Sequence, residues 1–538
     1  MKRSAAPDAS ATADRVVDSA GRSGAGGRNA RLATLITAAL LAFAFIGRAV
    51  ISSDGAEVMA DSLGLMVTGR LEAATVPPES IDPYFPPSPP FRSRYGAFSS
   101  IAILPFLALA WPFRGALRAQ GLDAVVALTW TCGAALATWG FLRLARALKS
   151  DVSALWAPAF LAGTFLWPYS ADSFFEPLAA FGLALAVERI LAGDPSRPFG
   201  VALAAAGVCG AAFLKPVLWV TAPVVILGAL LRWKDRPAAL RFVALLFAFL
   251  ATGLAVALLV NLARQGRWED FGYGYSSLPF VTPLTTGLWG LVLSPGRGLF
   301  LYAPLALVAL FAARRLNRAE LVLCFGVPVV LLLVACRWYG WHGGSAWGPR
   351  YLLPVLPLLC APAVLLPRKV TRLAVAAGIL VNVLGVCVAP GAWISWVERL
   401  PSPPDVVWPK AGSDRVSEIP ALSPVYGHLW LLVGSARPGA LPAFWALPGD
   451  GGPPPPKPAE FISPWALRRL LGLPRLRPLL PRILTRTAAA YAYRGRPEQA
   501  VLFAREALRL DPLESDARTI VAAGGRLATP PAAGVKAP

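Results

Sequence analysis

The sequence predicts an all-α, polytopic transmembrane protein. Of its 538 residues, 56% are hydrophobic and only 15% are charged, whereas soluble domains carry about 25% charged residues. The apolar residues come in runs bounded by Arg, Lys, Gly or Pro, and each run has about the length that spans a bilayer as a helix, roughly 17 to 25 residues. This composition excludes a soluble enzyme, a coiled coil and a disordered chain.

Eleven apolar runs are predicted to cross the membrane. They are 32–51, 123–142, 153–168, 173–192, 199–214, 217–231, 239–262, 298–313, 319–336, 351–366 and 372–390.

A further apolar stretch, residues 97–113, is ambiguous between a span and an interfacial helix. If it crossed the membrane, Arg143, Arg146 and Lys149 would lie outside, and the sidedness of every later loop would be reversed. Basic residues instead favour the cytoplasmic side of a membrane. The charges therefore favour an interfacial or re-entrant helix at 97–113, with the N-terminus inside and the C-terminus outside.

Four regions are expected along the chain. Residues 1–31 form a disordered basic cytoplasmic tail, 32–390 the membrane domain, 391–463 a Pro/Gly-rich linker-like segment outside, and 464–538 a small helical tail. Within that tail, AAAYAYRGRPEQAVLFAREALRLDP resembles one tetratricopeptide unit. Residues 482–528 would then offer a surface to a protein partner, and the alternative is an ordinary helical hairpin docked on the protein.

The formal net charge of +21 points to the lipid bilayer as a partner. The basic residues are dispersed between apolar spans and form no continuous patch, which argues against nucleic acid. The six cysteines show no paired metal-type spacing, and with only two histidines a His-rich metal site is excluded.

The first outer loop begins with an acidic segment directly after the first span. In a helix, Asp54, Glu57 and Asp61 share one face, while the opposite face, with Met59 and Leu63, would lie in lipid. A carboxylate so placed could act as a general base on an acceptor hydroxyl. The alternative is that these acids only stabilise the start of a helix.

Three more candidate positions lie at outer ends of predicted spans. Asp172 and Glu176 could bind sugar hydroxyls, or could cap the following helix. Arg297 lies between glycines in SPGRGLFLYAP, where a guanidinium can approach a phosphate closely. Lys215 is a weaker case of the same kind, and lipid headgroups are the alternative anion for both cations.

The richest candidate is the segment RWYGWHGGSAWGPRY, residues 337–351. Its glycines and arginines suit a loop that binds a phosphate and a sugar ring. We expect Arg350 to bind the phosphate; the ring-binding candidates are Trp341, His342, Trp347 and Tyr351. The alternative is an interfacial aromatic belt.

These features together resemble the GT-C membrane glycosyltransferases, especially the family-39-like, lipid-carrier-dependent bacterial branch. The similarity spans roughly residues 32–390 and is one of layout and short motifs. It implies an enzyme of the bacterial inner membrane that transfers a sugar from a polyprenyl-phosphate (or diphosphate) carrier to an extracytoplasmic lipid, glycan or protein. The active site would face outward, and no nucleotide sugar would be used there.

The resemblance also implies roles for individual residues. Asp54 matches the catalytic base, although the family often has an adjacent Asp-Glu, so Asp54 and Glu57 both stay candidates. Arg350, in WGPRY, matches the basic residue at the carrier phosphate, and in the mechanism that we expect Arg297 and Arg94 assist it. No cofactor is required, although a divalent metal such as Mg or Mn could assist at the acids.

Two other classes of function stay open at this point. A transporter or flippase for a lipid-linked substrate would also use arginines, but it usually carries charged residues within its spans and repeated halves. A non-catalytic membrane scaffold would use the tetratricopeptide-like tail to recruit a partner.

Overall fold

The computed structural model describes residues 9–48, 53–68, 97–388, 423–436 and 497–525. Gaps within these ranges lie at 195, 234–235, 269–279 and 345. Six further residues are described individually: 393, 394, 417, 481, 485 and 488. The regular secondary structure of the described residues is helical, as predicted.

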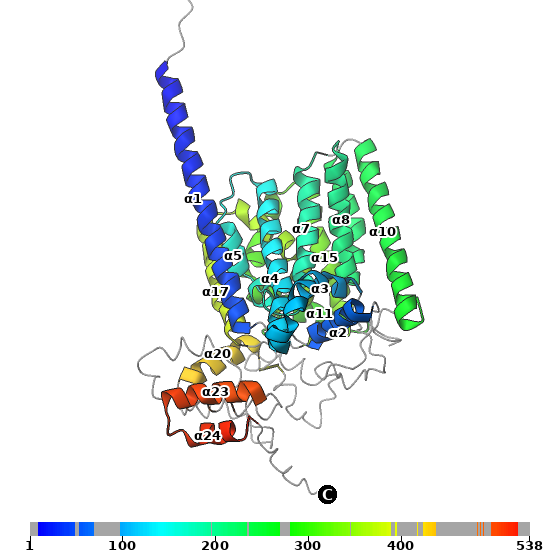
Figure 1. Ribbon diagram of the computed structural model, residues 1–538. Coiled ribbons are helices and arrows are strands. Elements are labelled where there is room, and N and C mark those ends of the chain that lie inside the picture. Colours follow the sequence, from blue (N-terminus) through cyan, green and yellow to red (C-terminus); the bar gives the residue numbers. More distant parts are fainter. Residues whose placement is uncertain are drawn as a thin grey trace, which may run out of the picture.

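Long helices run side by side along one common direction and form the body of the molecule (Figure 1). They are α1 (Ala9–Arg48), α4 (Arg114–Leu148), α7 (Glu176–Ala192), α8 (Pro198–Leu214), α10 (Arg236–Gln265), α15 (Val327–Arg337) and α17 (Arg368–Cys387). Among the described residues, five stretches are long and apolar enough to cross a membrane. These are Gly27–Ile46, Ala124–Leu148, Ala239–Ala263, Arg318–Arg337 and Arg368–Cys387.

Each of the eleven predicted spans coincides with helical structure, but several of them are broken into short pieces. The pieces are α5 (Trp156–Ala162), α6 (Leu166–Tyr169), η3 (Pro216–Thr221), α9 (Ala222–Arg232), α12 (Leu299–Tyr302), α13 (Pro304–Leu310), α14 (Arg318–Leu321), η7 (Arg350–Val355), α16 (Leu356–Cys360) and η8 (Ala361–Leu365). Prolines explain much of this, because each one removes a backbone donor and crowds the preceding turn. In η7, for example, Pro354 lies inside a 3₁₀ segment.

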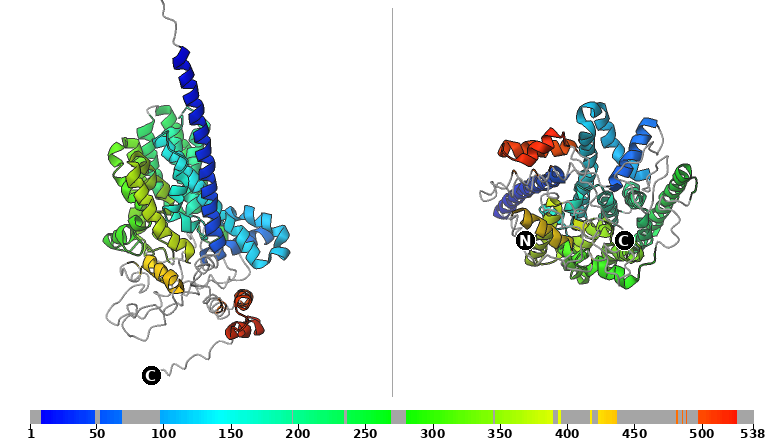
Figure 2. Two further views of the ribbon diagram at one scale, coloured as in Figure 1. Left: turned by 90° about the vertical axis from the view of Figure 1, so that its left-hand side faces the viewer. Right: turned by 90° about the horizontal axis from the view of Figure 1, so that it is seen from below.

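Two helices, α2 (Ser53–Thr68) and α3 (Ala97–Ala110), lie across one end of the bundle and project to its side (Figures 1 and 2). The hydroxyl of Ser62 joins them, because it donates to the carbonyl of Ser100 at 2.9 Å. This arrangement agrees with a helix at 97–113 that does not run parallel to the spans.

The expected lipid-facing side of α2 packs partly against protein. Met59 is 8% exposed and lies in a cluster with Ile103 of α3 and Trp130 of α4, and Leu63 packs against the same cluster. The expectation that Met59 faces lipid is therefore wrong. Helix periodicity alone could not show that α3 and α4 cover this face.

Three segments expected to be irregular contain helices. Helix α1 begins at Ala9, within the tail expected to be disordered, where Ala and Arg favour helix. Helix α11 (Leu284–Leu288) lies in the predicted loop 263–297 and packs against α15. Helix α20 (Pro424–Ala436) lies within the Pro/Gly-rich segment, and His428 on it is fully buried against the membrane domain.

The C-terminal tail contributes α23 (Pro497–Leu510) and α24 (Ser515–Ala522), which pack on each other at the same end of the molecule as α2 and α3 (Figure 1). Three alanines of the tetratricopeptide-like stretch, Ala488, Ala500 and Ala507, are completely buried. The tetratricopeptide assignment and the partner surface stay predictions.

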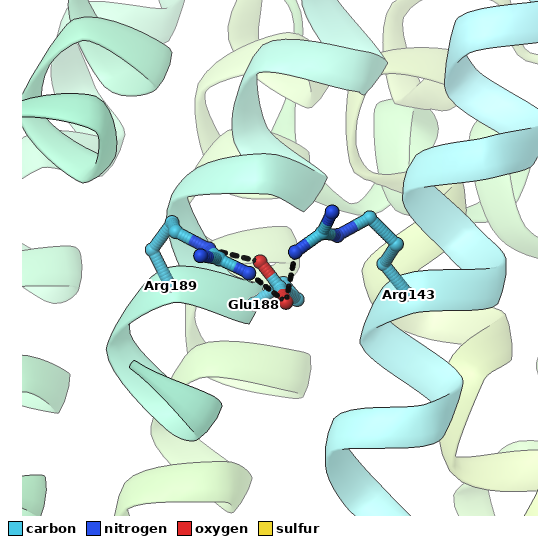
Figure 3. Close-up of polar contacts among 3 residues, drawn as sticks. All are labelled: Arg143, Glu188 and Arg189. Carbon is cyan, nitrogen blue, oxygen red and sulfur yellow. Dashed lines mark hydrogen bonds and ion pairs between the residues drawn. The ribbon is translucent and has the colours of Figure 1, made fainter. Parts of the chain in front are cut away.

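The opposite end of the bundle is fixed by a buried ion-pair cluster. The carboxylate of Glu188, near the end of α7, accepts hydrogen bonds from Arg143 of α4, at 2.9 Å, and from Arg189 (Figure 3). Nearby, Arg232 at the end of α9 donates to the carbonyl of Leu191 at 2.9 and 3.1 Å. Arginines at this end thus tie α4, α7 and α9 together.

Helices α7 and α8 approach each other closely because glycines face each other at their contact. A Cβ added at Gly207 of α8 would lie 2.6 Å from the carbonyl oxygen of Gly182 and 3.2 Å from the Cβ of Ala186, both on α7. Small residues allow this backbone approach, on which helix packing in membranes depends. Gly210, one turn further along α8, has nothing within 4 Å of its added Cβ.

Substitution of Gly207 by Ala should therefore lower stability, whereas the same change at Gly210 should not. We expect Gly207→Ala to cost about 1–3 kcal/mol, the usual range for overpacking, and to lower the thermal unfolding midpoint of the purified protein. Gly210→Ala is the matched control. Equal midpoints for the two variants would contradict the close contact between α7 and α8.

Candidate functional site

A buried cluster of charges lies where α7, α8 and η7 meet, at the end of the bundle that also carries α2 and α3. The Nζ of Lys215 lies 2.9 Å from Oε1 of Glu176, and the Nε of Arg350 lies 3.3 Å from the same oxygen. The side chains of Glu176, Arg350 and Lys215 are 2%, 11% and 18% exposed. We call these three residues the Glu176 cluster.

Local sequence explains how each member is positioned. Glu176 is the first residue of α7 and is followed by Pro177, a residue that suits the first turn of a helix. Lys215 ends α8 in extended conformation, because Pro216 follows it. Arg350 begins η7 directly after Pro349. The ends of α7, α8 and η7 thus bring their three charged side chains together.

The turn before Arg350 requires glycine at Gly348. Its φ is +67°, a left-handed conformation that only glycine adopts without cost. A Cβ there would also lie 2.9 Å from the ring of Tyr302. The sequence WGPRY therefore fixes the start of η7 and the position from which Arg350 extends.

Arg297 holds the loop in front of this turn in place. Its side chain is fully buried, and its guanidinium donates hydrogen bonds to the carbonyls of Gly344 and Ala346. The hydroxyl of Tyr302 donates to the carbonyl of Gly296, at 2.9 Å, which fixes the position of its ring. These contacts give Arg297 a structural task. Its role at a carrier phosphate stays a prediction.

Two of the predicted ring-binding residues lie deep in the protein. Trp347 is fully buried, and its Nε1 donates to Oδ1 of Asn382 at 3.1 Å. Asn382 donates in turn to the carbonyls of Tyr302 and Gly378, at 2.9 and 2.8 Å. Trp341 is 4% exposed and packs on Gly290. For both tryptophans, contact with a sugar stays a prediction.

Of the other two predicted ring-binding residues, Tyr351 lies beside the Glu176 cluster. The ring of Tyr351 lies 5.3 Å from the guanidinium carbon of Arg350, and that carbon also lies 4.3 Å over the ring of Phe174. His342 is 9% exposed, and its Nδ1 accepts from the backbone N–H of Gly344 at 3.1 Å. The aromatic rings limit the directions that Arg350 can take.

Tyr169 and Asp172 complete the surroundings of the cluster. Among the described residues, the buried hydroxyl of Tyr169 has no hydrogen-bond partner. Burial raises the pKa of Tyr169 well above its usual value, while the charges of Arg350 and Asp172 act on it in opposite directions. The phenol therefore stays protonated and is able to donate. Asp172 is half-buried and accepts from the backbone N–H of Ser173 at 3.0 Å.

The sequence had indicated most of these residues but not how they combine. From the sequence, Glu176 was expected to bind sugar hydroxyls, and Lys215 and Arg350 were expected to bind the phosphate. In the structure all three form one ion-paired group. Tyr169 was not a predicted site residue. Its only sequence signal is its place in the polar segment WPYSADSFFEP.

Three predicted site residues cannot be placed in this arrangement. Asp54 and Glu57 belong to α2, but their side chains lie outside the described residues, as does Arg94. Asp61, on the same helix, is described and fully buried. Among the described residues, no three His, Cys, Asp or Glu side chains come together as metal ligands. The roles of Asp54, Glu57 and Arg94 stay predictions.

Two solved structures resemble this protein in comparisons with known proteins. No family model matches the chain, and no curated protein matches it. Both solved structures are of ArnT from Cupriavidus metallidurans. The structure bound to undecaprenyl phosphate has 13% identity and a TM-score of 0.44, covering 76% of this chain and 71% of that one. The apo structure has 14% identity and the same TM-score, covering 91% and 74%.

The contacts of Arg297 predict that its loss will loosen the loop that precedes Arg350. Lysine keeps the charge but cannot reach two carbonyls with one planar group. We therefore expect Arg297→Lys to cost about 1–3 kcal/mol, since a buried carbonyl is left without a donor, and to speed hydrogen exchange in residues 341–350.

The control for this prediction is Arg315, which also donates to a carbonyl, that of Leu365, but is exposed. Arg315→Lys should change stability by less than about 0.5 kcal/mol, as expected for a surface substitution. If hydrogen exchange in 341–350 were the same in Arg297→Lys and wild type, the loop would be held by other contacts.

Proposed function

We propose that this protein is a membrane glycosyltransferase that transfers a sugar from a polyprenyl-phosphate carrier to an extracytoplasmic acceptor. The observation that carries the proposal is the Glu176 cluster. In this buried group, Lys215 and Arg350 share one carboxylate at the end of a helical bundle that is built to lie in a membrane. An anionic group attached to a lipid can reach such a position from the bilayer.

The charges of the cluster support a phosphate ligand. Lys215 and Arg350 outnumber the one carboxylate that contacts both of them, and Arg297 adds a further buried cation nearby. Buried charges of one sign are costly without a counter-ion. A guanidinium can also contact two phosphate oxygens at once. Three cations gathered in one buried region therefore favour an anion over a neutral ligand.

The position of α2 supports the proposed base. This helix follows α1 in the sequence and lies across the end of the bundle at which α7 begins (Figure 1), and it carries Asp54 and Glu57. In the proposed reaction Asp54 removes the proton from an acceptor hydroxyl. The oxygen then bonds to the anomeric carbon while the bond from that carbon to the phosphate oxygen breaks. Arg350 stabilises the charge on the departing phosphate.

The topology of the chain provides a first test, because the proposal needs the Glu176 cluster outside the cytoplasm. A reporter fused after Lys149, at the end of α4, should be cytoplasmic, and one fused after Gly525 should be extracytoplasmic. Alkaline phosphatase and a fluorescent protein report the two sides. If the fusion after Lys149 were outside, α3 would cross the membrane and the cluster would face the cytoplasm.

The reaction itself is tested with the purified protein, a panel of polyprenyl-phosphate sugars and membrane acceptors. Formation of free polyprenyl phosphate is the readout, since it does not depend on which sugar or acceptor is used. Asp54→Asn should lower the rate about 100-fold or more, as loss of a general base does, and Glu57→Gln should lower it less.

Asp151→Asn is the matched control, because Asp151 is an exposed acid at the opposite end of the bundle, beside Lys149. It should retain the wild-type rate. Equal rates for Asp54→Asn and wild type would exclude Asp54 as the base. A larger loss in Glu57→Gln would exchange the two roles. If wild type formed polyprenyl phosphate from none of the donors, the proposed function would be overturned.

A further inference from the structure

The Glu176 cluster has an unusual feature: both cations contact the same carboxylate oxygen. Oε1 of Glu176 lies 2.9 Å from the Nζ of Lys215 and 3.3 Å from the Nε of Arg350. Among the described residues, neither oxygen of this carboxylate receives a hydrogen bond of good geometry, although both oxygens are buried. The contacts are therefore held by charge, with little directional bonding.

The second buried glutamate of α7 shows what a structural ion pair looks like in this protein. Both oxygens of Glu188 accept aligned hydrogen bonds, from Arg143 and Arg189 (Figure 3). A carboxylate satisfied in this way is strongly retained by its partners. Glu188 fits a fixed link between α4 and α7, whereas the contacts of Glu176 are easier to exchange.

A phosphate near Arg350 would compete with Glu176 for the same positive charge. Two anions next to one cation repel each other, and this repulsion is strong where the effective dielectric constant is low. Binding of the phosphate therefore requires that Arg350 turn from Oε1 toward the ligand. Lys215, 2.9 Å from that oxygen, keeps Glu176 compensated while Arg350 turns.

We infer that Glu176 is an internal counter-ion, which positions Lys215 and Arg350 and which the carrier phosphate must displace from Arg350. This inference rests on the proposed function. Glu176 thereby makes phosphate binding weaker than the cations alone would make it. It also helps the product leave, because the carboxylate pairs with Arg350 again as the phosphate departs. Glu176 is a positioning residue and does not touch the reacting atoms.

The inference predicts a gain of affinity from the loss of a charge. In nanodiscs that contain the full-length protein, Glu176→Gln should bind polyprenyl monophosphate roughly tenfold more tightly than wild type, a change of about 1.4 kcal/mol. Binding of the uncharged polyprenol should be the same in both proteins, because it does not compete with the carboxylate. A residue that only supports the fold would not raise affinity.

Glu188→Gln is the matched control on the same helix. It also removes a buried carboxylate that holds two cations, so it should lower the thermal unfolding midpoint at least as much as Glu176→Gln. Its affinity for polyprenyl monophosphate should equal that of wild type. A rise in affinity in both variants would mean that loose packing, and not the counter-ion, causes the effect.

A second comparison applies if Glu176→Gln does not fold, because that variant removes the buried carboxylate that Lys215 and Arg350 both contact. Lys215→Gln should bind polyprenyl monophosphate more weakly than wild type, and the double variant Lys215→Gln/Glu176→Gln, which keeps the net charge, should bind it more tightly than Lys215→Gln alone. Equal or lower affinity on removal of Glu176 in a folded background would overturn the inference while leaving the proposed function intact. If wild type did not bind polyprenyl monophosphate, both would fail.

Discussion

The apolar interior of the bundle makes every buried charge dependent on a partner, and helix α7 carries such a charge at each end. Glu188 joins α7 to Arg143 of α4, and Glu176 joins it to Lys215 after α8 and to Arg350 at the start of η7. Removing one partner of a buried ion pair is usually strongly destabilising, because the other charge stays behind in a medium that solvates it poorly. These contacts therefore link segments that are distant in the sequence into one structure.

The two ends of α7 nevertheless differ in chemical character. At the Glu188 end, hydrogen bonds satisfy both carboxylate oxygens, and the arginines lie toward the outside of the bundle with 24–32% exposure. At the Glu176 end, neither carboxylate oxygen receives an aligned hydrogen bond among the described residues, and the phenol of Tyr169 and the ring of Phe174 lie close to Arg350. Buried carboxylates without aligned hydrogen bonds are unusual, and interacting ionisable groups of this kind gather at functional sites. The same kind of interaction thus supports the fold at one end and a site at the other.

The sequence predicted the helical segments better than their contacts. Hydropathy alone located helical structure at the eleven predicted positions, and five described stretches are long and apolar enough to cross a membrane, because such a helix is defined by properties of the chain itself. The burial of Met59 depends on α3 and α4, and the pairing of Glu176 depends on α8 and η7, none of which periodicity can bring together. Arg297 shows the same limit: its glycine neighbours indicated a close approach to an anion, whereas its guanidinium approaches the carbonyls of Gly344 and Ala346. Single-sequence patterns show which residues are unusual but not which partners they meet.

The contact between Gly182 and Gly207 also determines how the sequence around the site can change. It fixes the axial offset of α7 against α8, so the distance along each helix from this contact to Glu176 and to Lys215 is fixed as well. Each residue added to an α-helix rotates everything before it by about 100° and shifts it by about 1.5 Å. One inserted residue between positions 176 and 182 would therefore turn the carboxylate away from both cations, although the inserted residue itself would contact neither. This stretch of α7 can accept changes of side chain, but its length is constrained by the geometry of the helix.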